Sequence, residues 1–277
     1  MSTKINKLFS EINNVPQIAE VIRLLINQLN DPDIDLKEVA KNVEKEQIIS
    51  LKVLRLVNSA SFALPKKIAT IEEAVILLGM VKLKTLVIAS GIVSSMPKID
   101  NFDINQFWLN SFSTATYARW LANASGSNAD IAFTAGLLSG LGTVLIHLGL
   151  PKEALEIERL YKEGGHSRPF LEKMRLGFTS QDLSAELCTR WKFSEELIGP
   201  ISQCGDPLIV DPPSKIACSI FLARQISLCN ATQMSEEETL ALIPPAIIKL
   251  LGFPELFFKE KLGEIMALES GLESLLD

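Results

Sequence analysis

The sequence predicts an all-α protein whose helices form two lobes. Apolar residues recur at every third or fourth position through most of the chain, and no segment alternates apolar and polar residues as a half-buried strand does. A polar, turn-rich stretch, Met96–Asp103, separates two helix-rich halves. We therefore expect a two-lobed multi-helix bundle, with an N-terminal helical lobe over residues 1–98 and a C-terminal lobe over residues 99–277.

Turn and capping residues place the helices of the first lobe. Pro16, a good first-turn residue, precedes an apolar stripe of helical spacing, and the Asp31-Pro32 pair marks the end of that stripe. Two later helices begin with the spacing of a capping box, in which paired side chains bond the first backbone N–H groups: Asp35 with Glu38, and Thr70 with Glu73. Two more apolar helices are expected over about residues 48–57 and 81–95.

Longer helical segments make up the second lobe. Thr179 and Asp182 have capping-box spacing at the start of one of them. The expected helices cover about residues 104–124, 129–148, 152–163, 181–191, 195–203 and 214–229.

The segment Ile131–Pro151 carries no formal charge and is long enough to span a bilayer. It also contains Gly136 and Gly140 at the spacing found where membrane helices dimerise. Glycine, threonine, serine and histidine residues dilute its hydrophobicity, however, and the chain has no second candidate span. We interpret this segment as a helix buried in a soluble core.

Composition excludes several classes of protein. The net charge of −6 and the pI of about 5.2 argue against a general nucleic-acid binder, which needs a basic face. The cysteines at 188, 204, 218 and 229 form no CxxC pair or disulfide framework, and the N-terminus has no apolar signal segment. We expect a cytoplasmic protein whose thiols are reduced and buried; a zinc site built from the four thiols is the alternative.

Several sequence blocks stand in a fixed order along the chain. The first half contains Asn14-Val-Pro16, Leu36-Lys-Glu-Val-Ala40, Leu51–Ala60 and Ile68–Gly79. The second half contains Phe107–Phe112, Ala135–Thr143 and Thr179–Trp191. In this order the blocks resemble the HDOD family, a branch of the HD superfamily related to the HD-GYP group and found in bacterial signalling proteins. The resemblance covers nearly the whole chain and implies a C-terminal lobe with the fold of HD phosphohydrolases.

The resemblance also implies metal ligands that this chain lacks. The His-Asp helix of the hydrolases is similar to residues 135–143, with Ser139 and Gly140 in place of the two ligands. Asn110 and Ser180 stand at further histidine positions, and Gln203 lies where paired histidines often precede a proline. Helix 214–229, where a last aspartate is expected, contains no carboxylate.

The two histidines of the chain do not replace these ligands. His147 lies about two turns beyond Ser139, and His166 lies in an expected loop. Hydrolysis in this superfamily depends on a metal that activates water, and such a site needs several converging imidazole and carboxylate groups. We therefore expect no metal, no cofactor and no enzymatic activity. The three tryptophans, at 108, 120 and 191, are expected in the core rather than in a ligand pocket.

The leading interpretation is a non-catalytic bacterial regulatory module for signal transduction that acts through protein–protein interaction. The partner would be a signalling protein supplied in trans, with no nucleic acid and no membrane involved, and homodimerisation stays open. A contiguous exposed apolar patch of several hundred Å2 is expected on such a module.

Two alternatives remain. In the first, the former active-site cleft is a metal-free pocket for a nucleotide or cyclic dinucleotide, with hydrogen bonds from Asn110, Ser139, Ser180 and Gln203. In the second, the chain is a divergent HD-type phosphohydrolase.

Asn58 and Ser59 follow an apolar helix in the first lobe. Asparagine tolerates left-handed backbone and can close a helix while its amide bonds nearby carbonyls, so we interpret the pair as a structural motif. A partner-recognition point is the alternative.

Overall fold

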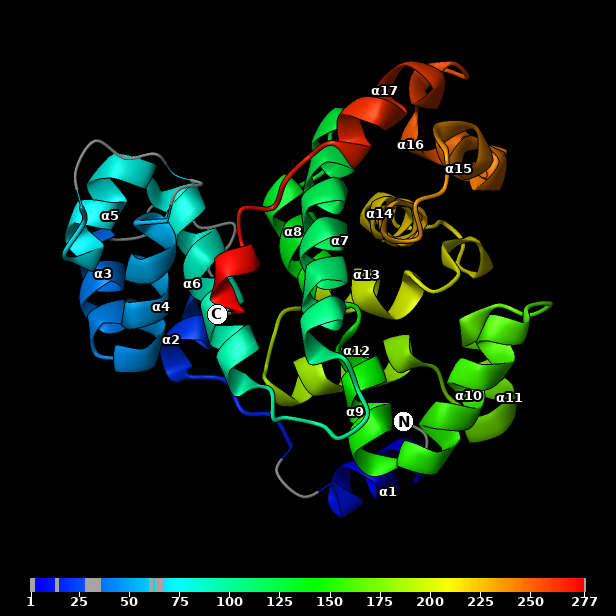
Figure 1. The fold of residues 1–277 in the computed structure, drawn as a ribbon, viewed down its shortest axis with the longest axis horizontal. Coiled ribbons are helices and arrows are strands. Elements are labelled where there is room, and N and C mark those ends of the chain that lie inside the picture. The colour runs from blue at the N-terminus through cyan, green and yellow to red at the C-terminus, as the bar shows by residue number, and fades with distance from the viewer. Residues whose placement is uncertain (1–2, 13–14, 28–35, 60–61, 63–66, 277) are drawn as a thin grey trace. The chain divides into compact units, whose positions relative to one another are not determined.

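The computed structural model describes residues 3–12, 15–27, 36–59, 62 and 67–276. Every regular element in these residues is a helix, so the all-α prediction is confirmed (Figure 1). The Asp31-Pro32 break, the Asp35 cap, Asn14 and Ala60 lie outside the described residues.

The chain divides into two compact units, each discontinuous in sequence. The first unit contains residues 1–15, 98–190 and 194–268, and the second contains residues 16–97, 191–193 and 269–277. These units differ from the continuous lobes 1–98 and 99–277 expected from the sequence. Residues 1–15 belong to the unit that contains most of the C-terminal half, and residues 191–193 and 269–277 belong to the unit that contains most of the N-terminal half.

The second unit is a small helical bundle. Its helices are α2 (Glu20–Asn27), α3 (Leu36–Glu44), α4 (Gln47–Val57), α5 (Ile71–Leu78), α6 (Met80–Ser95) and the 3-10 turn η3 (Glu273–Leu275). Buried aliphatic side chains such as Ile22, Val53 and Leu83 form its core. Gly91 lets α2 and α6 approach closely, since a Cβ there would lie 2.4 Å from a side-chain carbon of Ile22.

Asn58 closes α4 with its side chain. Its amide nitrogen donates to the carbonyls of Leu54 and Ile68, both at 2.8 Å, and its oxygen accepts from the Ile68 backbone N–H at 2.7 Å. The φ angle of Asn58 is −86°, so the helix ends without a left-handed residue. Asn58 thereby joins the end of α4 to the segment that leads into α5. Ser59 follows at the bend, and its hydroxyl, a buried atom, has no hydrogen-bond partner among the described residues.

The first unit contains the remaining helices, among them α7 and α14, which are 21 and 17 residues long. They are α1 (Thr3–Glu11), α7 (Ile104–Ala124), α8 (Ala129–Leu138), α9 (Leu141–Gly149), α10 (Pro151–Glu163), α11 (Arg168–Leu176), α12 (Ser180–Arg190), α13 (Glu195–Gln203), η2 (Pro207–Ile209), α14 (Lys215–Ala231), α15 (Glu236–Leu242), α16 (Pro245–Leu251) and α17 (Phe257–Met266). Helices α7, α8 and α14 pack against one another at the centre of this unit (Figure 1). The expected cap of α12 is present: Thr179 and Asp182 bond each other's backbone N–H groups at 2.8 and 3.1 Å.

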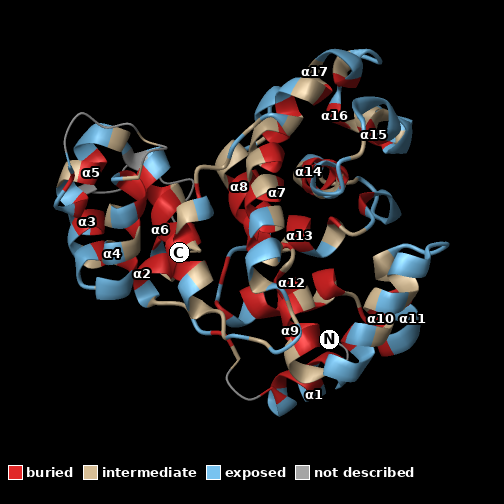
Figure 2. Cartoon of the chain, in the orientation of Figure 1, coloured by how far each residue is buried: buried red, intermediate tan, exposed pale blue. Residues whose placement is uncertain are grey.

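The apolar segment near residue 140 is two helices rather than the single helix expected over 129–148. Helix α8 ends at Leu138 and α9 begins at Leu141, with a turn at Ser139 and Gly140. The run Ala129–Gly149 is long and apolar enough to cross a membrane by composition, but 89% of it is buried inside the protein. Figure 2 shows α8 and α9 as largely buried elements of this unit. Its apolar character is therefore accounted for by the core.

Two glycines of this segment permit close helix packing. A Cβ on Gly136 would lie 3.0 Å from the Cα of Ala115, so this residue brings α8 against α7. A Cβ on Gly142 would lie 1.8 Å from the backbone oxygen of Ser180, so Gly142 brings α9 against the start of α12. Gly136 and Gly142 thus have packing roles within this unit.

These contacts predict that two nearby alanine substitutions change the free energy of unfolding by very different amounts. Gly142→Ala should lower the free energy of unfolding by about 3 kcal/mol, because the new methyl group meets backbone that cannot move aside. Gly140→Ala should change it by less than about 1 kcal/mol, because Gly140 has helical backbone angles and its nearest neighbour is the ring edge of Phe107 at 3.1 Å. Urea unfolding of both variants tests this, and equal losses would contradict the packing described.

Candidate functional site

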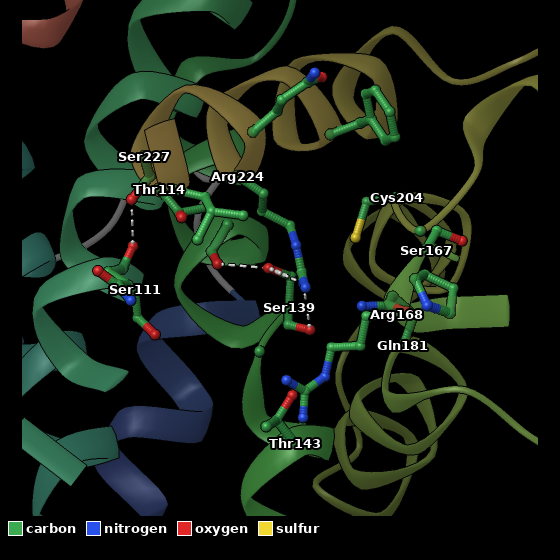
Figure 3. A pocket seen from close by; sticks show the side chains of 18 of the residues that line it. Ser111, Thr114, Ser139, Thr143, Ser167, Arg168, Gln181, Cys204, Arg224 and Ser227 are labelled. Carbon is green, nitrogen blue, oxygen red and sulfur yellow. Dashed lines mark hydrogen bonds between the residues drawn. The ribbon is translucent and has the colours of Figure 1, made fainter. Parts of the chain in front are cut away.

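A cavity of about 500 Å3 lies within the first unit (Figure 3). Its walls come from α7, from the turn between α8 and α9, from α14, from the ends of α10 to α13 that face them, and from the junction between α15 and α16. Two of the four residues proposed as ligand contacts, Asn110 and Ser139, line it. Ser180 and Gln203 do not, but their next neighbours Gln181 and Cys204 do. Because one residue turns a helix by about 100°, a shift of one position moves a side chain out of the wall.

The turn at Ser139 and Gly140 releases backbone groups from the helix. Thr143 N–H bonds the Gly140 carbonyl at 2.9 Å, a tighter step than that of an α-helix. The hydroxyl of Ser184, on α12, donates to the Ser139 carbonyl at 3.0 Å and accepts from Gly142 N–H at 2.8 Å. One buried serine on α12 therefore satisfies both groups and fixes the turn in place.

Arg224 extends from α14 to the same turn. Its Nη1 donates to the Ser139 carbonyl at 3.2 Å and more weakly to the Ser139 hydroxyl at 3.4 Å. In the orientation that satisfies both ends of its amide, Gln181 accepts from the guanidinium through its side-chain oxygen at 3.1 and 3.2 Å. Figure 3 shows the guanidinium lying next to Ser139 inside the cavity. Neutral oxygens therefore hold a half-buried cation in position.

No carboxylate neutralises Arg224 among the described residues. None of the lining side chains is an aspartate or glutamate, and Arg224 forms no ion pair within the described part of the chain. A second lining arginine, Arg168, is compensated: it bonds Glu158 at 2.8 Å and Glu172 at 2.9 Å. Arg224 therefore gives the cavity wall an uncompensated positive charge.

Arg168 belongs to a polar network beside the cavity. The Glu172 side chain is fully buried and also accepts from the backbone N–H of Ser180 at 2.6 Å, at the first turn of α12. The Nε2 of His147 lies 3.6 Å from the Glu158 carboxylate, within ion-pair distance but too far for a hydrogen bond. His147, together with Arg168, holds the pKa of Glu158 at about 2 although partial burial raises it. This network anchors Arg168 and the start of α12.

The described residues contain no group of three or more histidine, cysteine, aspartate or glutamate side chains placed to hold a metal ion. Cys204 lines the cavity, and burial raises the pKa of its thiol although nearby Arg224 lowers it. All four cysteines are free and buried, as expected from the sequence. Trp108 and Trp191 are buried in the core, Trp120 packs near Phe257, and none of the three lines the cavity.

Apolar side chains form the remainder of the wall. Phe107, Phe221 and Pro244 contribute apolar surface, and Leu228 and Leu242 are 43% and 46% exposed. The cavity therefore combines a cationic, hydrogen-bonding part around Arg224 with an apolar part that includes exposed leucines.

Sequence reasoning missed both arginines. It examined helix 214–229 for a carboxylate and found none, but the same helix carries another signal: after Lys215 at its start, Arg224 is the only charged residue between positions 216 and 231. A single charge in an otherwise apolar helix has to reach either solvent or a polar cavity. Arg168 gave no such signal, because it lies among other charged residues, and Glu172 four positions later and Glu158 ten positions earlier are ordinary helix-surface residues in the sequence.

The low pKa of Glu158 predicts a pH-dependent contribution to stability. The carboxylate is easier to ionise in the folded protein (about 2) than its ordinary value of 4.5, so it stabilises the fold above that ordinary value. This contribution is lost as the pH falls toward 2. The difference in Tm between the wild type and Glu158→Gln should therefore be largest above pH 5 and shrink toward pH 3. A difference that stays constant would contradict the ion-pair network.

The cavity lies in a fold that solved structures share. A crystal structure from Shewanella amazonensis, which carries the provisional name of a phosphohydrolase, is 31% identical, covers 99% of this chain and 98% of its own, and has a TM-score of 0.80. An HDOD domain protein of unknown function from Geobacter sulfurreducens is 23% identical, with coverage of 96% and 95% and a TM-score of 0.77.

Sequence comparison gives the family. A Treponema pallidum protein of uncharacterised function is 26% identical over 192 residues, which is 69% of this chain and 37% of that protein. The chain thus spans little more than a third of this relative. The model of the HDOD domain matches residues 15–207, most of the chain; this range includes the cavity residues from Phe107 to Gly205, whereas Arg224 and the rest of the wall from Phe221 to Pro244 lie beyond it. The chain belongs to the HDOD family.

Proposed function

We propose that this chain is a non-catalytic regulatory module that acts in bacterial signalling by binding a protein partner supplied in trans. The observation that carries the proposal is the position of Arg224: its guanidinium lies at Ser139, at a position where the hydrolases that this family resembles have a metal ligand.

The charge of Arg224 opposes metal binding in the cavity. Two positive charges on a metal and one on the guanidinium, about 4 Å apart at an effective dielectric constant of about 20, repel by about 8 kcal/mol. A metal site can overcome such electrostatic repulsion only when carboxylate and imidazole ligands bind the ion. The wall offers neither among its described residues, so the energetic balance favours an empty or anion-filled cavity.

Exposed apolar side chains of the second unit support a role in protein binding. Ile48 and Leu51 on α4, Ile76 on α5 and Val81 on α6 are 66%, 68%, 77% and 55% exposed. We call these four residues the α4–α6 surface; α5 packs against both α4 and α6. Ile48 and Leu51 are three positions apart and therefore share one face of α4, and large aliphatic side chains that are exposed together are typical of sites that a partner covers.

The names of structural relatives fit two different roles. The Shewanella amazonensis relative is provisionally named a phosphohydrolase, which makes hydrolysis the alternative for this chain. A Marinobacter aquaeolei protein, provisionally named a signal transduction protein, shares the fold at a TM-score of 0.77 and 18% identity. The loss of metal-binding side chains from the cavity favours the regulatory role.

The cavity itself favours a second candidate function, that of a ligand sensor. Its volume of about 500 Å3 lies within the range of about 300–1,000 Å3 that is usual for small-molecule sites. A nucleotide or cyclic dinucleotide bound there would act as the input to the regulatory module.

Metal analysis and a hydrolysis screen test the regulatory role. The purified protein should contain far less than one metal ion per chain and should release no product from phosphomonoesters or phosphodiesters with added Mn2+, because the cavity lacks ligands to activate water. The same assay on Arg224→Gln shows whether any trace of activity comes from the cavity. Stoichiometric metal together with turnover that a chelator abolishes would overturn the proposal.

The α4–α6 surface is tested with paired substitutions. A protein captured specifically by the wild type should be lost with Leu51→Asp combined with Ile76→Asp, because charge on the surface cannot be desolvated against an apolar partner. Leu256→Asp, at an apolar site in the first unit that is 55% exposed, is the matched control and should retain the partner. Equal retention by both variants would exclude this surface, and size-exclusion chromatography with light scattering distinguishes a second copy of the chain from another protein.

A further inference from the structure

We propose that the cavity binds a small phosphate ester, with the phosphate on the guanidinium of Arg224 and the organic group against the apolar part of the wall. The inference rests on the proposed function in one respect, since it requires that no metal occupies the cavity. It adds the chemical class of the ligand and the residue that recognises it.

The first argument concerns the charge of Arg224. Its Nη1 and Nη2 bond neutral oxygens of Ser139 and Gln181, and the Cys204 thiol lies beside it, so these groups orient the guanidinium without neutralising it. A half-buried cation without a counter-charge is costly, because burial removes part of its hydration. An anion that enters the cavity supplies the missing charge and makes charge-assisted hydrogen bonds with the remaining N–H groups.

The neighbouring arginine does not play this role. Arg168 also lines the cavity, but Glu172 and Glu158 accept from its Nε and Nη1, and their carboxylates offset its charge. Its network holds the start of α12, including the position next to Gln181. The recognition of an anion is therefore assigned to Arg224 alone.

Further donors and the shape of the cavity favour phosphate. The hydroxyls of Thr114 and Thr143 belong to the same wall, and Figure 3 shows Thr143 on the Ser139 side of the cavity, near the guanidinium of Arg168. A guanidinium presents its N–H groups as a planar fork that matches two oxygens of a phosphate. Because the whole protein carries a net charge of −6, attraction of a phosphate depends on this local cation rather than on the overall field.

The apolar part of the wall identifies the other half of the ligand. Phe221, Leu228, Leu242 and Pro244 line the same cavity as Arg224, and the two leucines keep nearly half of their surface exposed. An inorganic anion alone would leave this surface uncovered. An aromatic or apolar group joined to the phosphate, such as the base of a nucleotide, covers it.

Calorimetry and thermal shift with three probes test the inference: inorganic phosphate, AMP and adenosine. AMP should raise the Tm of the wild type and bind more tightly than phosphate, and adenosine should bind at least tenfold more weakly than AMP because it lacks the charge. Arg224→Gln should weaken AMP and phosphate at least tenfold. Arg55→Gln makes the same change in net charge at an exposed position on α4 outside the cavity wall and should bind like the wild type.

A second pair of variants does not depend on the structural role of Arg224. Leu228→Glu places a carboxylate in the cavity wall at a residue that is already 43% exposed, and Leu228→Gln is its neutral match. The glutamate variant should bind AMP several-fold more weakly than the glutamine variant, with both retaining the wild-type circular dichroism spectrum. The absence of binding by both phosphate and AMP at up to about 10 mM, or binding that neither Arg224→Gln nor Leu228→Glu weakens, overturns the inference.

The fate of the bound AMP separates the two proposals. Recovery of intact AMP after incubation with Mn2+ supports both. Recovery of adenosine and free phosphate would leave the anion site standing and remove the non-catalytic role. If no phosphate ligand binds and no hydrolysis occurs, the anion site fails and the regulatory module stands.

Discussion

The turn between α8 and α9 is the constraint on which the cavity depends. At Ser139 and Gly140 the helix tightens, and the Ser139 carbonyl is left for groups outside the helix. Ser184 bonds this carbonyl from α12 and Arg224 bonds it from α14, so one oxygen joins three elements. Any side chain at Gly142 would collide with the backbone of Ser180 at the start of α12. The shape of the wall follows from these contacts.

The turn has a chemical consequence as well as a structural one. In the hydrolases that this family resembles, the corresponding helix supplies a histidine and an aspartate to a metal. Here Ser139 supplies oxygens, and those oxygens hold a cationic side chain rather than a metal ion. The positive charge in the cavity therefore comes from a guanidinium, whereas in the hydrolases it comes from a metal ion. A guanidinium can bind and orient an anion, whereas it does not lower the pKa of a coordinated water as a metal does.

Much of the fold was predictable because periodicity and capping are local properties. The expected helices 104–124 and 195–203 match α7 and α13 at both ends, and the Thr179–Asp182 cap forms as predicted. The break after Leu138 was missed although the pair Ser139-Gly140 is typical of turns, because the apolar residues on both sides continue one helical pattern and the turn is fixed by Ser184, far along the chain. Of the four proposed ligand contacts, Asn110 and Ser139 line the cavity, and Ser180 and Gln203 are each next to a residue that does. Arg224 was overlooked because the search was for metal ligands.

A crystal structure of the protein grown with Mn2+ and AMP measures the central claim most directly, because anomalous scattering locates manganese without ambiguity. The account predicts phosphate oxygens within hydrogen-bond distance of the Arg224 guanidinium and no manganese in the cavity. A manganese ion coordinated by side chains of the wall, with Arg224 turned away from Ser139, would contradict it.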